Sequence, residues 1–552
     1  MDLPADWRVT PADPLLERSY ADPDLDDAGW EPVTVPGHWR SHPAFADSDG
    51  PLLYRVPFTA DRSTGDERVW LVFDGVFYQS DVWLDGGYVG DTEGYFFGHT
   101  FEVTEALRAG DEHLLATQIH CPPPGDRTAK RNLTGVFQHW DCIDPDLNPG
   151  GIWRPVRLER TGPIRLRRLS VVCMEAGTEA ATLRFRAFAD SAEPAIAKIA
   201  TTVGEQDPYT EELSLAAGEN QLEWQVTVPE PDLWWPWSLG EQPRYDVRVD
   251  AIGEDGTVSH TVRRKVGVRS LVFDDWQLSV NGERLFLKGA NLAPTRALLG
   301  DATEADVRRD IDLARDAGLD LVRVHAHVSV PALYDQADER GMLVWQDLPL
   351  QWGYARSVRK QAVRQARKAV EVLGHHASVV VWCGHNEPLA IEAPTGDLAD
   401  PAAFRKAGLR TALAMELPTW NKTVLDRSVK RALEKADGSR PVVPHSGVWP
   451  HLPGSTAPTA TSTSAGTTGT SGTCRASRPS CPAWSASCPS SGRRPSRPRP
   501  TSSSPSAGPT STGSGSRSIT GSSGSSSTAA CPRSTTPRST TGRSPPRRTR
   551  RR

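Results

Sequence analysis

No stretch of this sequence approaches the roughly eighteen consecutive apolar residues that a membrane-spanning helix needs. The opening segment, Met1–Asp6, includes neither a basic cluster nor an apolar run, so we expect no secretory leader. These two absences predict a chain without a membrane partner, located in the cytoplasm.

Cysteine is scarce before Gly454. The thiols of that part are Cys121, Cys142, Cys173 and Cys383. Their spacing matches no metal-binding motif and no disulfide framework, so we expect reduced thiols and no metal site.

Acidic residues are absent from the last 98 residues, which follow Gly454. This tail also lacks Lys, Asn, Gln, His, Leu, Val, Phe, Tyr and Met, and it consists almost wholly of Ser, Thr, Pro, Gly, Ala and Arg. Such a composition cannot bury a core, so residues 454–552 are predicted to be disordered. Cys474, Cys481 and Cys488 recur at a regular interval, but no histidine accompanies them to suggest a metal site.

Charge is divided unevenly between the tail and the rest of the chain. The tail holds fifteen of the 63 basic residues, which leaves 48 basic against 68 acidic residues before it, a net charge of −20. This negative excess argues against nucleic acid as a partner. It suits either a high-salt cytoplasm or simply good solubility, and it leaves the oligomeric state undecided.

Two β-rich domains are expected in the first half. Residues 1–162 contain short strands such as Val69–Phe73 and Asp81–Leu84, with a turn at Asp85–Gly87. Apolar residues then recur with period two through residues 163–274, as in Leu183, Phe185 and Ala187. This alternation predicts a β-sandwich with one buried face per sheet.

Strand and helix patterns alternate from residue 275 to 453, which predicts a parallel (β/α) barrel. The expected strands are 285–291, 321–325, 342–347, 378–383 and 441–446. Because a TIM barrel has eight strands, we expect an incomplete barrel with about five of them.

The fourth expected strand ends in an unusual polar pair. Its apolar run, Val379–Trp382, is too short for a helix and predicts a strand buried on both faces. Asn386 and Glu387 follow, and their polar groups are costly to desolvate where a buried strand meets a loop. At the carboxyl end of a barrel strand such a pair indicates catalysis, although a glutamate there can also form a plain salt bridge.

The segment Trp382–Glu387, after a Ser-Val-Val-Val strand, resembles the acid/base motif of glycoside hydrolase family 2, and is closest to its β-mannosidase branch. Residues 73–104 and 150–156 are similar to the jelly roll of that family, and residues 233–245 to a hallmark of its immunoglobulin-like sandwich. The resemblance implies that Glu387 is the general acid/base and that Asn386 holds the sugar 2-hydroxyl. A retaining glycosidase needs one carboxyl that protonates the leaving oxygen and then deprotonates water.

The same resemblance implies further sugar-binding residues. It puts Arg323 beside the nucleophile, and Trp345 and Asp347 around the sugar, although Asp347 alone could be a structural carboxylate. In β-mannosidases a Trp-Asp-Trp-Gly-Pro segment reaches into the sugar pocket; residues 139–145 keep Trp140 and Asp141 but not the second Trp or the Gly. Mannose preference therefore stays open, and Trp140 could instead pack in the core.

A nucleophile is missing where the family needs one. It belongs three strands beyond Glu387, roughly 90 or more residues later at about 30 residues per βαβ unit, but no Asp or Glu follows Asp437. At that distance stands Cys488–Pro495. Written as TGT CCG AGT TCG GGG CGC AGG CCG and translated from the third base, it gives Ser-Glu-Phe-Gly-Ala-Gln-Ala, which contains the Ser-Glu-Phe-Gly of the family's nucleophile motif. We therefore favour a reading-frame shift near Gly454 over a genuine Ser/Thr-rich stalk.

The resemblance, together with these patterns, implies a retaining exo-β-glycosidase that removes terminal non-reducing β-linked sugars, is β-mannosidase-like and uses no cofactor. Its substrate is an oligosaccharide or β-glycoside, and the chain as given is expected to be inactive. The alternatives are a β-galactosidase or β-glucuronidase relative, and a non-catalytic carbohydrate-binding protein.

Overall fold

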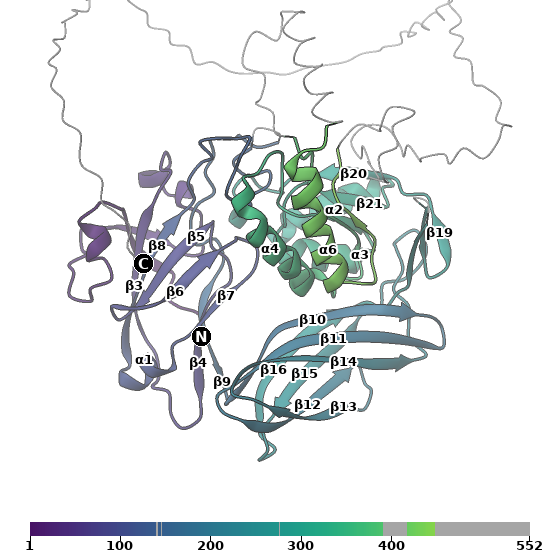
Figure 1. Ribbon diagram of the computed structural model, residues 1–552, viewed down its shortest axis with the longest axis horizontal. Coiled ribbons are helices and arrows are strands. Elements are labelled where there is room, and N and C mark those ends of the chain that lie inside the picture. Colours follow the sequence, from purple (N-terminus) through teal and green to yellow (C-terminus); the bar gives the residue numbers. More distant parts are fainter. Residues whose placement is uncertain (140–141, 145, 275–276, 390–416, 448–552) are drawn as a thin grey trace, which may run out of the picture. The chain divides into compact units, whose positions relative to one another are not determined.

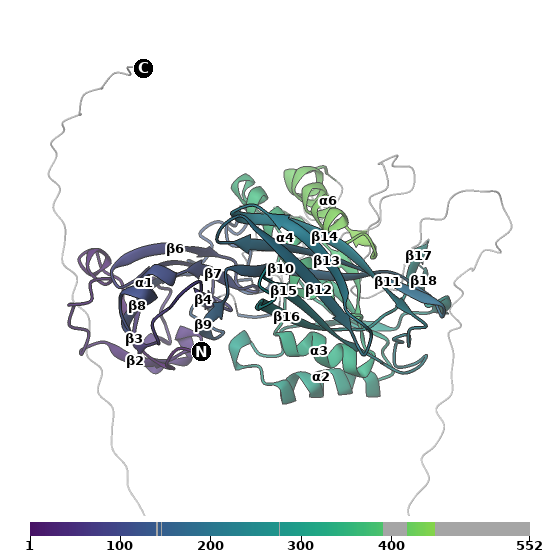
Figure 2. The same cartoon turned by 90° about the horizontal axis from the view of Figure 1, so that it is seen from below.

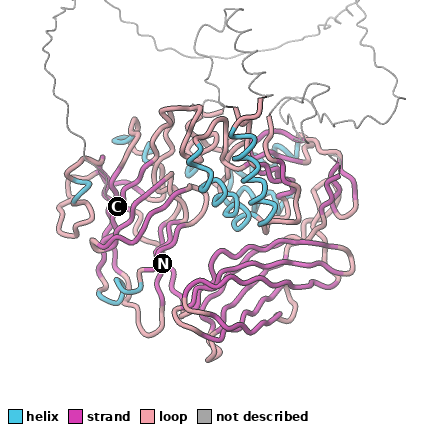
Figure 3. The backbone as a smooth tube through the Cα atoms, viewed as in Figure 1, coloured by secondary structure: helices cyan, strands magenta, loops and turns pink. Residues whose placement is uncertain are grey.

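The computed structural model describes residues 1–139, 142–144, 146–274, 277–389 and 417–447 (Figure 1). Strands make up most of its first half, and the longer helices gather around one parallel sheet (Figure 3). None of the described helices is long and apolar enough to cross a membrane. The predicted tail, residues 454–552, lies outside the described residues, as do Trp140 and Asp141.

The first domain is a sandwich of two antiparallel sheets. One sheet has the order β2-β1-β3-β8-β5-β6, and the other has the order β7-β4-β9. The strands are β1 (Asp6–Pro11), β2 (Glu31–Thr34), β3 (Leu52–Thr59), β4 (Arg68–Phe73), β5 (Gln79–Leu84), β6 (Gly87–Glu93), β7 (His99–Glu102), β8 (Glu112–His120) and β9 (Val156–Thr161). Short helices interrupt them: η1 (Leu16–Arg18), η2 (Trp39–Ser41), η3 (Pro43–Phe45) and α1 (Thr104–Ala109). The predicted turn joins β5 to β6 through Asp85 and Gly86, both with positive φ.

The second domain is also a two-sheet sandwich, with orders β10-β11-β14 and β13-β12-β15-β16. Its strands are β10 (Ile164–Ala176), β11 (Ala180–Ser191), β12 (Ala195–Val203), β13 (Tyr209–Leu215), β14 (Gly218–Pro229), β15 (Tyr245–Ile252) and β16 (Val258–Val266). Along β14 the buried residues Leu222, Trp224, Val226 and Val228 alternate with exposed ones. The period-two pattern of the sequence therefore marks the inner face of this sheet.

The strand predicted at 285–291 is wrong in its boundaries. Leu285 instead ends a small antiparallel sheet of β17 (Leu271–Asp274), β18 (Gln277–Val280) and β19 (Glu283–Leu285). The reason is a two-residue turn, Asn281-Gly282, with φ of 50° and 86°, which folds β19 back onto β18. The first parallel strand, β20, covers Gly289–Leu292.

The parallel sheet has the order β20-β21-β22-β23-β24. Its other strands are β21 (Leu321–Val324), β22 (Leu343–Asp347), β23 (Val379–Cys383) and β24 (Val442–Val443). The helices between and beside them are η4 (Leu299–Asp301), α2 (Glu304–Asp316), α3 (Pro331–Arg340), η5 (Arg356–Val358), α4 (Arg359–Leu373), η6 (Asn421–Leu425) and α6 (Asp426–Ala436). Figure 2 shows α2 beside α3 and α4 beside α6. A capping box formed by Thr303 and Asp306 begins α2.

β23 is buried over its whole length, as the run of apolar residues predicts. Burying a valine side chain stabilises the fold by about 1.5–3 kcal/mol, so the three valines of β23 fix this strand strongly in the sheet. Its neighbours on either side, β22 and β24, run parallel to it. The carboxyl ends of all five strands therefore lie at the same edge of the sheet.

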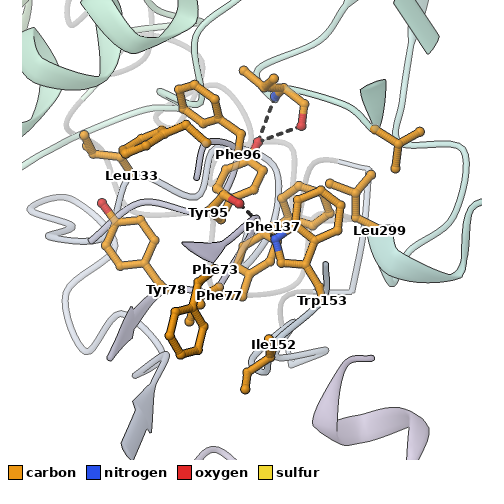
Figure 4. Close-up of a cluster of buried hydrophobic side chains, with 14 of the residues drawn as sticks. Phe73, Phe77, Tyr78, Tyr95, Phe96, Leu133, Phe137, Ile152, Trp153 and Leu299 are labelled. Atoms are coloured by element: carbon orange, nitrogen blue, oxygen red, sulfur yellow. Dashed lines mark hydrogen bonds between the residues drawn. The ribbon is translucent and has the colours of Figure 1, made fainter. Parts of the chain in front are cut away.

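The first sandwich and the parallel sheet share one hydrophobic core, which Figure 4 shows in close-up. Tyr95 stacks on Phe77 with ring centroids 4.3 Å apart, and Trp153 donates its indole hydrogen to the Tyr95 carbonyl at 2.9 Å. The Tyr95 hydroxyl accepts from Val328 N at 2.7 Å and donates to Val328 O at 3.1 Å. Because Val328 follows β21, this contact fixes the sandwich against the strand ends.

Candidate active site

Polar side chains from three neighbouring strands meet at the carboxyl edge of the sheet. Arg323 of β21 lies in register with Trp345 of β22, and Asp347 of β22 with Cys383 of β23. Asn386 forms isolated β-bridges to Gln351 and to Ser446, which follow β22 and β24. The structure thus brings together Arg323, Trp345, Asp347, Asn386 and Glu387, the predicted site residues within its described part.

Arg323 is the centre of this cluster. Its guanidinium donates to both carboxylate oxygens of Asp347, at 3.2 and 2.6 Å. The same group donates to Asn386 Oδ1 and to Ser446 Oγ, both at 2.6 Å. Burial alone would lower the pKa of Arg323, but the negative charge of Asp347 raises it, and Cys383 and Glu387 act in the same direction with smaller effects. The buried cation is therefore compensated, as a buried charge must be.

Asp347 is fully engaged in this network and is completely buried. In addition to Arg323 it accepts from Trp345 Nε1 at 3.0 Å and from the Ala326 backbone N–H at 3.1 Å. Four donors on two oxygens hold the carboxylate in one orientation. Asp347 therefore orients Arg323 and Trp345.

Glu387 stands at the mouth of the cluster, half-buried, with a left-handed φ of 46°. A non-glycine residue in this region is uncommon and is held there by its surroundings. The Glu387 backbone N–H donates to Ser446 O at 2.9 Å, and Trp352 Nε1 donates to Glu387 Oε2 at 3.0 Å. Two strand-end loops thereby fix the position of this carboxyl.

Gly447 explains how Glu387 fits beside the end of β24. Gly447 has a φ of +73°, and a Cβ built on it would lie 2.5 Å from Glu387 Cγ and 3.2 Å from Asn386 Oδ1. Any larger residue would collide with the two predicted site residues. A glycine is required at this position both for its backbone conformation and for the close approach.

A second polar cluster contacts the loop that follows β22 and contains Trp352. The buried Asp426, at the start of α6, accepts from His385 Nδ1 at 2.8 Å and from His445 Nδ1 at 2.9 Å. Burial would raise the pKa of Asp426, but these two histidines lower it. His385 Nε2 contacts the Trp352 carbonyl at 2.7 Å. The chain of contacts from Asp426 therefore reaches the residue that holds Glu387.

Residues of the first domain contact the loops that follow β21 and β22. Gly135 packs on the Ala326 carbonyl so closely that a Cβ on it would lie 1.7 Å from that oxygen. The buried His139 contacts Trp352 edge to face, with ring centroids 5.1 Å apart. His139 directly precedes Trp140 and Asp141, whose predicted roles remain predictions because both lie outside the described residues.

Lys130, also from the first domain, is a buried cation near this loop. Its ammonium donates to the Gln351 carbonyl and lies 4.8 Å from the centre of the Tyr354 ring. It forms no ion pair within the part of the chain that the structure describes. Burial, helped by the positive charge of Arg127, lowers its pKa to about 7.

Sequence reasoning did not identify Trp352, Gln351, Ser446 and Gly447 as parts of the site. Ser446 ends a segment that the sequence predicts as a strand, so the strand-end rule that singled out Glu387 could have found it. Trp352 and Gln351 lie in an irregular loop and show no such signal. No group of three or more His, Cys, Asp or Glu side chains among the described residues is arranged to hold a metal ion.

The fold and the site together define a class: a multidomain protein in which two β-sandwiches precede a parallel β/α sheet with a polar site at its carboxyl edge. Residues 47–154 match the family model described as glycosyl hydrolase 2 galactose-binding domain-like, and residues 169–269 match that of glycosyl hydrolases family 2. The resemblance that the sequence indicates is thus confirmed: two domains of the chain match models of glycoside hydrolase family 2, and the chain is similar in sequence to β-mannosidases.

Individual relatives agree with this assignment. The β-mannosidase B of Aspergillus clavatus is 26% identical over 384 residues, which cover 62% of this chain and 44% of that protein. An exo-β-D-glucosaminidase of Streptomyces avermitilis is 32% identical over 321 residues, 54% of this chain and 34% of that protein. The chain therefore spans less than half the length of either relative.

A β-D-mannosidase structure from Dictyoglomus thermophilum is similar in fold. It superposes with a TM-score of 0.63 at 21% identity and covers 81% of this chain and 57% of that one. At this identity the similarity concerns the fold alone.

Proposed function

We propose that the protein is a retaining β-glycosidase that removes terminal non-reducing sugars, with Glu387 as its general acid/base. The observation that carries the proposal is the placement of Glu387, which is held by Trp352 and Ser446 at the carboxyl edge of the sheet beside the Arg323–Asp347–Asn386 network. A positioned carboxyl next to a rigid polar cluster suits proton transfer to a bound sugar.

In this mechanism Glu387 acts twice. Its protonated carboxyl donates a proton to the leaving oxygen as the glycosidic bond breaks, and the resulting carboxylate then removes a proton from the attacking water. The hydrogen bond from Trp352 Nε1 to Glu387 Oε2 fixes the orientation of the carboxyl in both steps.

The other residues of the site bind the sugar or line the subsite around it. Asn386 binds the sugar 2-hydroxyl through its amide, which Arg323 and Gln351 orient from two sides at 2.6 and 2.7 Å. Trp345 and Asp347 line the sugar subsite, and Arg323 lies beside the place that the nucleophile takes. The family resemblance adds Trp140 and Asp141, which lie outside the described residues, as proposed sugar-binding residues.

We further propose that the chain as given is inactive. A retaining mechanism needs two carboxyls roughly 5–5.5 Å apart, and no Asp or Glu follows Asp437. Among the described carboxylates near the site, Asp347 is bound by four donors and Asp426 by two histidines. Residues 275–453 are then an incomplete barrel after a jelly roll (1–162) and an immunoglobulin-like sandwich (163–274). Residues 454–552 are out-of-frame translation.

The sugar is proposed to be β-mannose. The relatives keep β-glucosamine, β-galactose and β-glucuronate as alternatives, because the family spans all of these. A non-catalytic carbohydrate-binding protein is the second candidate function, and the missing nucleophile favours it.

The first experiment is to sequence the DNA across the Gly454 codon. An open alternative frame that encodes Ser-Glu-Phe-Gly near Cys488 supports the enzyme. Clean Ser/Thr codons without such a frame support the carbohydrate-binding protein.

The second experiment uses the frame-restored protein. We expect Glu387→Gln to slow hydrolysis of β-1,4-mannobiose by about 10²–10⁴-fold, the usual contribution of a general acid. Formation of the glycosyl-enzyme from 2,4-dinitrophenyl β-mannoside, whose leaving group needs no proton, should be nearly unchanged. Glu254→Gln, at an exposed loop residue, is the matched control. Equal losses on both substrates would remove Glu387 from the acid role.

A further inference from the structure

A large cavity lies away from the predicted site. It has a volume of about 1050 Å³ and is lined by residues of β7, β9, β10, β16 and α4. These elements belong to the first sandwich, the second sandwich and the β/α part, so the cavity forms where three domains meet. Its lining includes none of Arg323, Trp345, Asp347, Asn386 or Glu387.

The charge of this cavity is opposite to that of the chain around it. Its lining includes nine arginines and Lys368 but only three acidic side chains, Asp91, Glu159 and Glu371. The chain before Gly454 carries a net charge of −20. Surface composition alone therefore does not account for ten cations on one cavity wall.

Some of these cations have structural partners. Arg165 pairs with Glu159 at 3.0 Å, and Lys368 pairs with Glu371 at 2.5 Å. Arg167 and Arg168 likewise reach carboxylates on neighbouring strands. These pairs hold the wall of the cavity in place.

Four other cations have no such partner. Arg263, Arg264, Arg364 and Arg367 form no ion pair with any described residue. Arg264 donates only to the Arg263 carbonyl, at 2.8 Å, and burial lowers its pKa. The guanidinium of Arg364 lies 5.9 Å from the centre of the Phe97 ring, over which Lys368 also sits at 5.8 Å. Arg364 interacts electrostatically with Glu93, but no described carboxylate forms an ion pair with any of the four arginines. The wall thus collects more positive charge than its ion pairs compensate.

The crowding affects neighbouring groups. Burial lowers the pKa of Lys368, and the charges of Arg168 and Arg364 lower it further, against the opposing effect of Glu371. Burial together with the charges of Arg364 and Lys368 lowers the pKa of His99 to about 4. A concave wall with this potential concentrates anions, because low-dielectric surroundings focus the field of the charges.

We propose that this cavity is a binding site for a small multivalent anion that carries phosphate or sulfate groups. Guanidinium groups match the geometry of tetrahedral oxyanions through paired hydrogen bonds. The volume is at the upper end of that for small-molecule sites, which is large enough for a phosphorylated or sulfated sugar. An anion bound there joins α4 to β10 and β16 and so stabilises the contact between the domains.

The test is calorimetric titration of the full 552-residue chain with inorganic phosphate, pyrophosphate, inorganic sulfate, glucose 6-phosphate and glucose 6-sulfate, with glucose as the uncharged control. We expect saturable binding of at least one anion, no binding of glucose, and a melting temperature that rises with the anion. Tighter binding of the phosphate series or of the sulfate series identifies the source of the ligand.

Variants locate the site. We expect Arg264→Gln to weaken binding about tenfold, with partial recovery in Arg264→Lys, which keeps the charge but loses the paired hydrogen bonds. Arg367→Gln is a second, exposed variant that should leave the fold intact. Arg309→Gln, at an exposed residue of α2 outside the cavity, is the matched control and should bind normally. Absence of saturable anion binding to the wild-type chain, or equal weakening by Arg309→Gln, would overturn the proposal.

Discussion

The candidate active site and the arginine-rich cavity between the domains differ in how their positive charges are paired. Arg323 is only 3% exposed and is surrounded by acceptors: Asp347, Asn386 and Ser446. The cavity instead gathers Arg263, Arg264, Arg364 and Arg367, none of which forms an ion pair with a described residue; only Arg364 is near enough to a carboxylate, Glu93, to affect its pKa. A polar network whose charges and hydrogen bonds are all satisfied within the protein keeps a site rigid. A cavity wall with unpaired positive charge instead favours the binding of an anion.

Breaking the compensated network should produce the largest effect on stability. Asp347→Asn leaves the Arg323 cation buried without its counter-charge, and we expect a loss of about 3–5 kcal/mol in the free energy of unfolding. The measurement is urea unfolding of the full chain. A double variant, Arg323→Met with Asp347→Leu, removes both charges and should recover part of that loss. A loss below about 1 kcal/mol in Asp347→Asn would show that the network is not a compensated pair.

Lys130 tests the comparison next to the site, because it is a buried cation that forms no ion pair with any residue the structure describes. Its folded pKa of about 7 lies below the ordinary 10.5. Between these values the unfolded chain binds one proton more than the folded chain, so stability should rise with pH by up to about 1.4 kcal/mol per unit. Below pH 7 both states are protonated and the slope disappears. The comparison is with Lys130→Met, which should lack this rise; identical pH profiles would place the Lys130 pKa near its ordinary value.

Gly447 shows how closely the site is packed. We expect Gly447→Ala to cost more stability than Gly318→Ala, which has a similar φ of +71° but no atom within 4 Å of the added Cβ. The backbone strain is shared by both variants and cancels when their stability losses are subtracted. The remaining difference should be about 1–3 kcal/mol, because only the Cβ at position 447 collides with Glu387. Both variants are compared by thermal unfolding. Equal losses would mean that Glu387 moves aside freely, which would contradict its fixed position.

Substituting a cation of the cavity should change stability in the opposite direction and by the smallest amount. Removing one of its crowded cations in Arg367→Gln relieves repulsion, so we expect a slight rise in stability, within about 0.5 kcal/mol. The rise should shrink as salt is added, since screening weakens the repulsion that the substitution removes. A clear loss of stability, on the scale of Asp347→Asn, would show that Arg367 has a structural partner and would weaken the contrast between the two regions.

Much of the fold follows from local patterns. The period-two stretches predict the sandwich strands, and the valine run before Asn386 and Glu387 predicts β23 and its polar end. The boundary of the first parallel strand was wrong because a turn at Asn281-Gly282 pairs Leu285 with β18, and apolar periodicity does not show which strand an apolar segment pairs with.

What the sequence by itself determined is the order of the domains, the parallel arrangement and the identity of Glu387 as a strand-end carboxyl. Only the tertiary structure decided which groups meet there: Ser446 lies 123 residues from Arg323 in the chain, and Trp352 contacts Glu387 from an irregular loop. The cationic cavity is also decided at this level, because its arginines come from three domains. The physical reason is that local periodicity specifies which face of an element is buried, whereas packing between elements specifies which polar side chains that burial brings together.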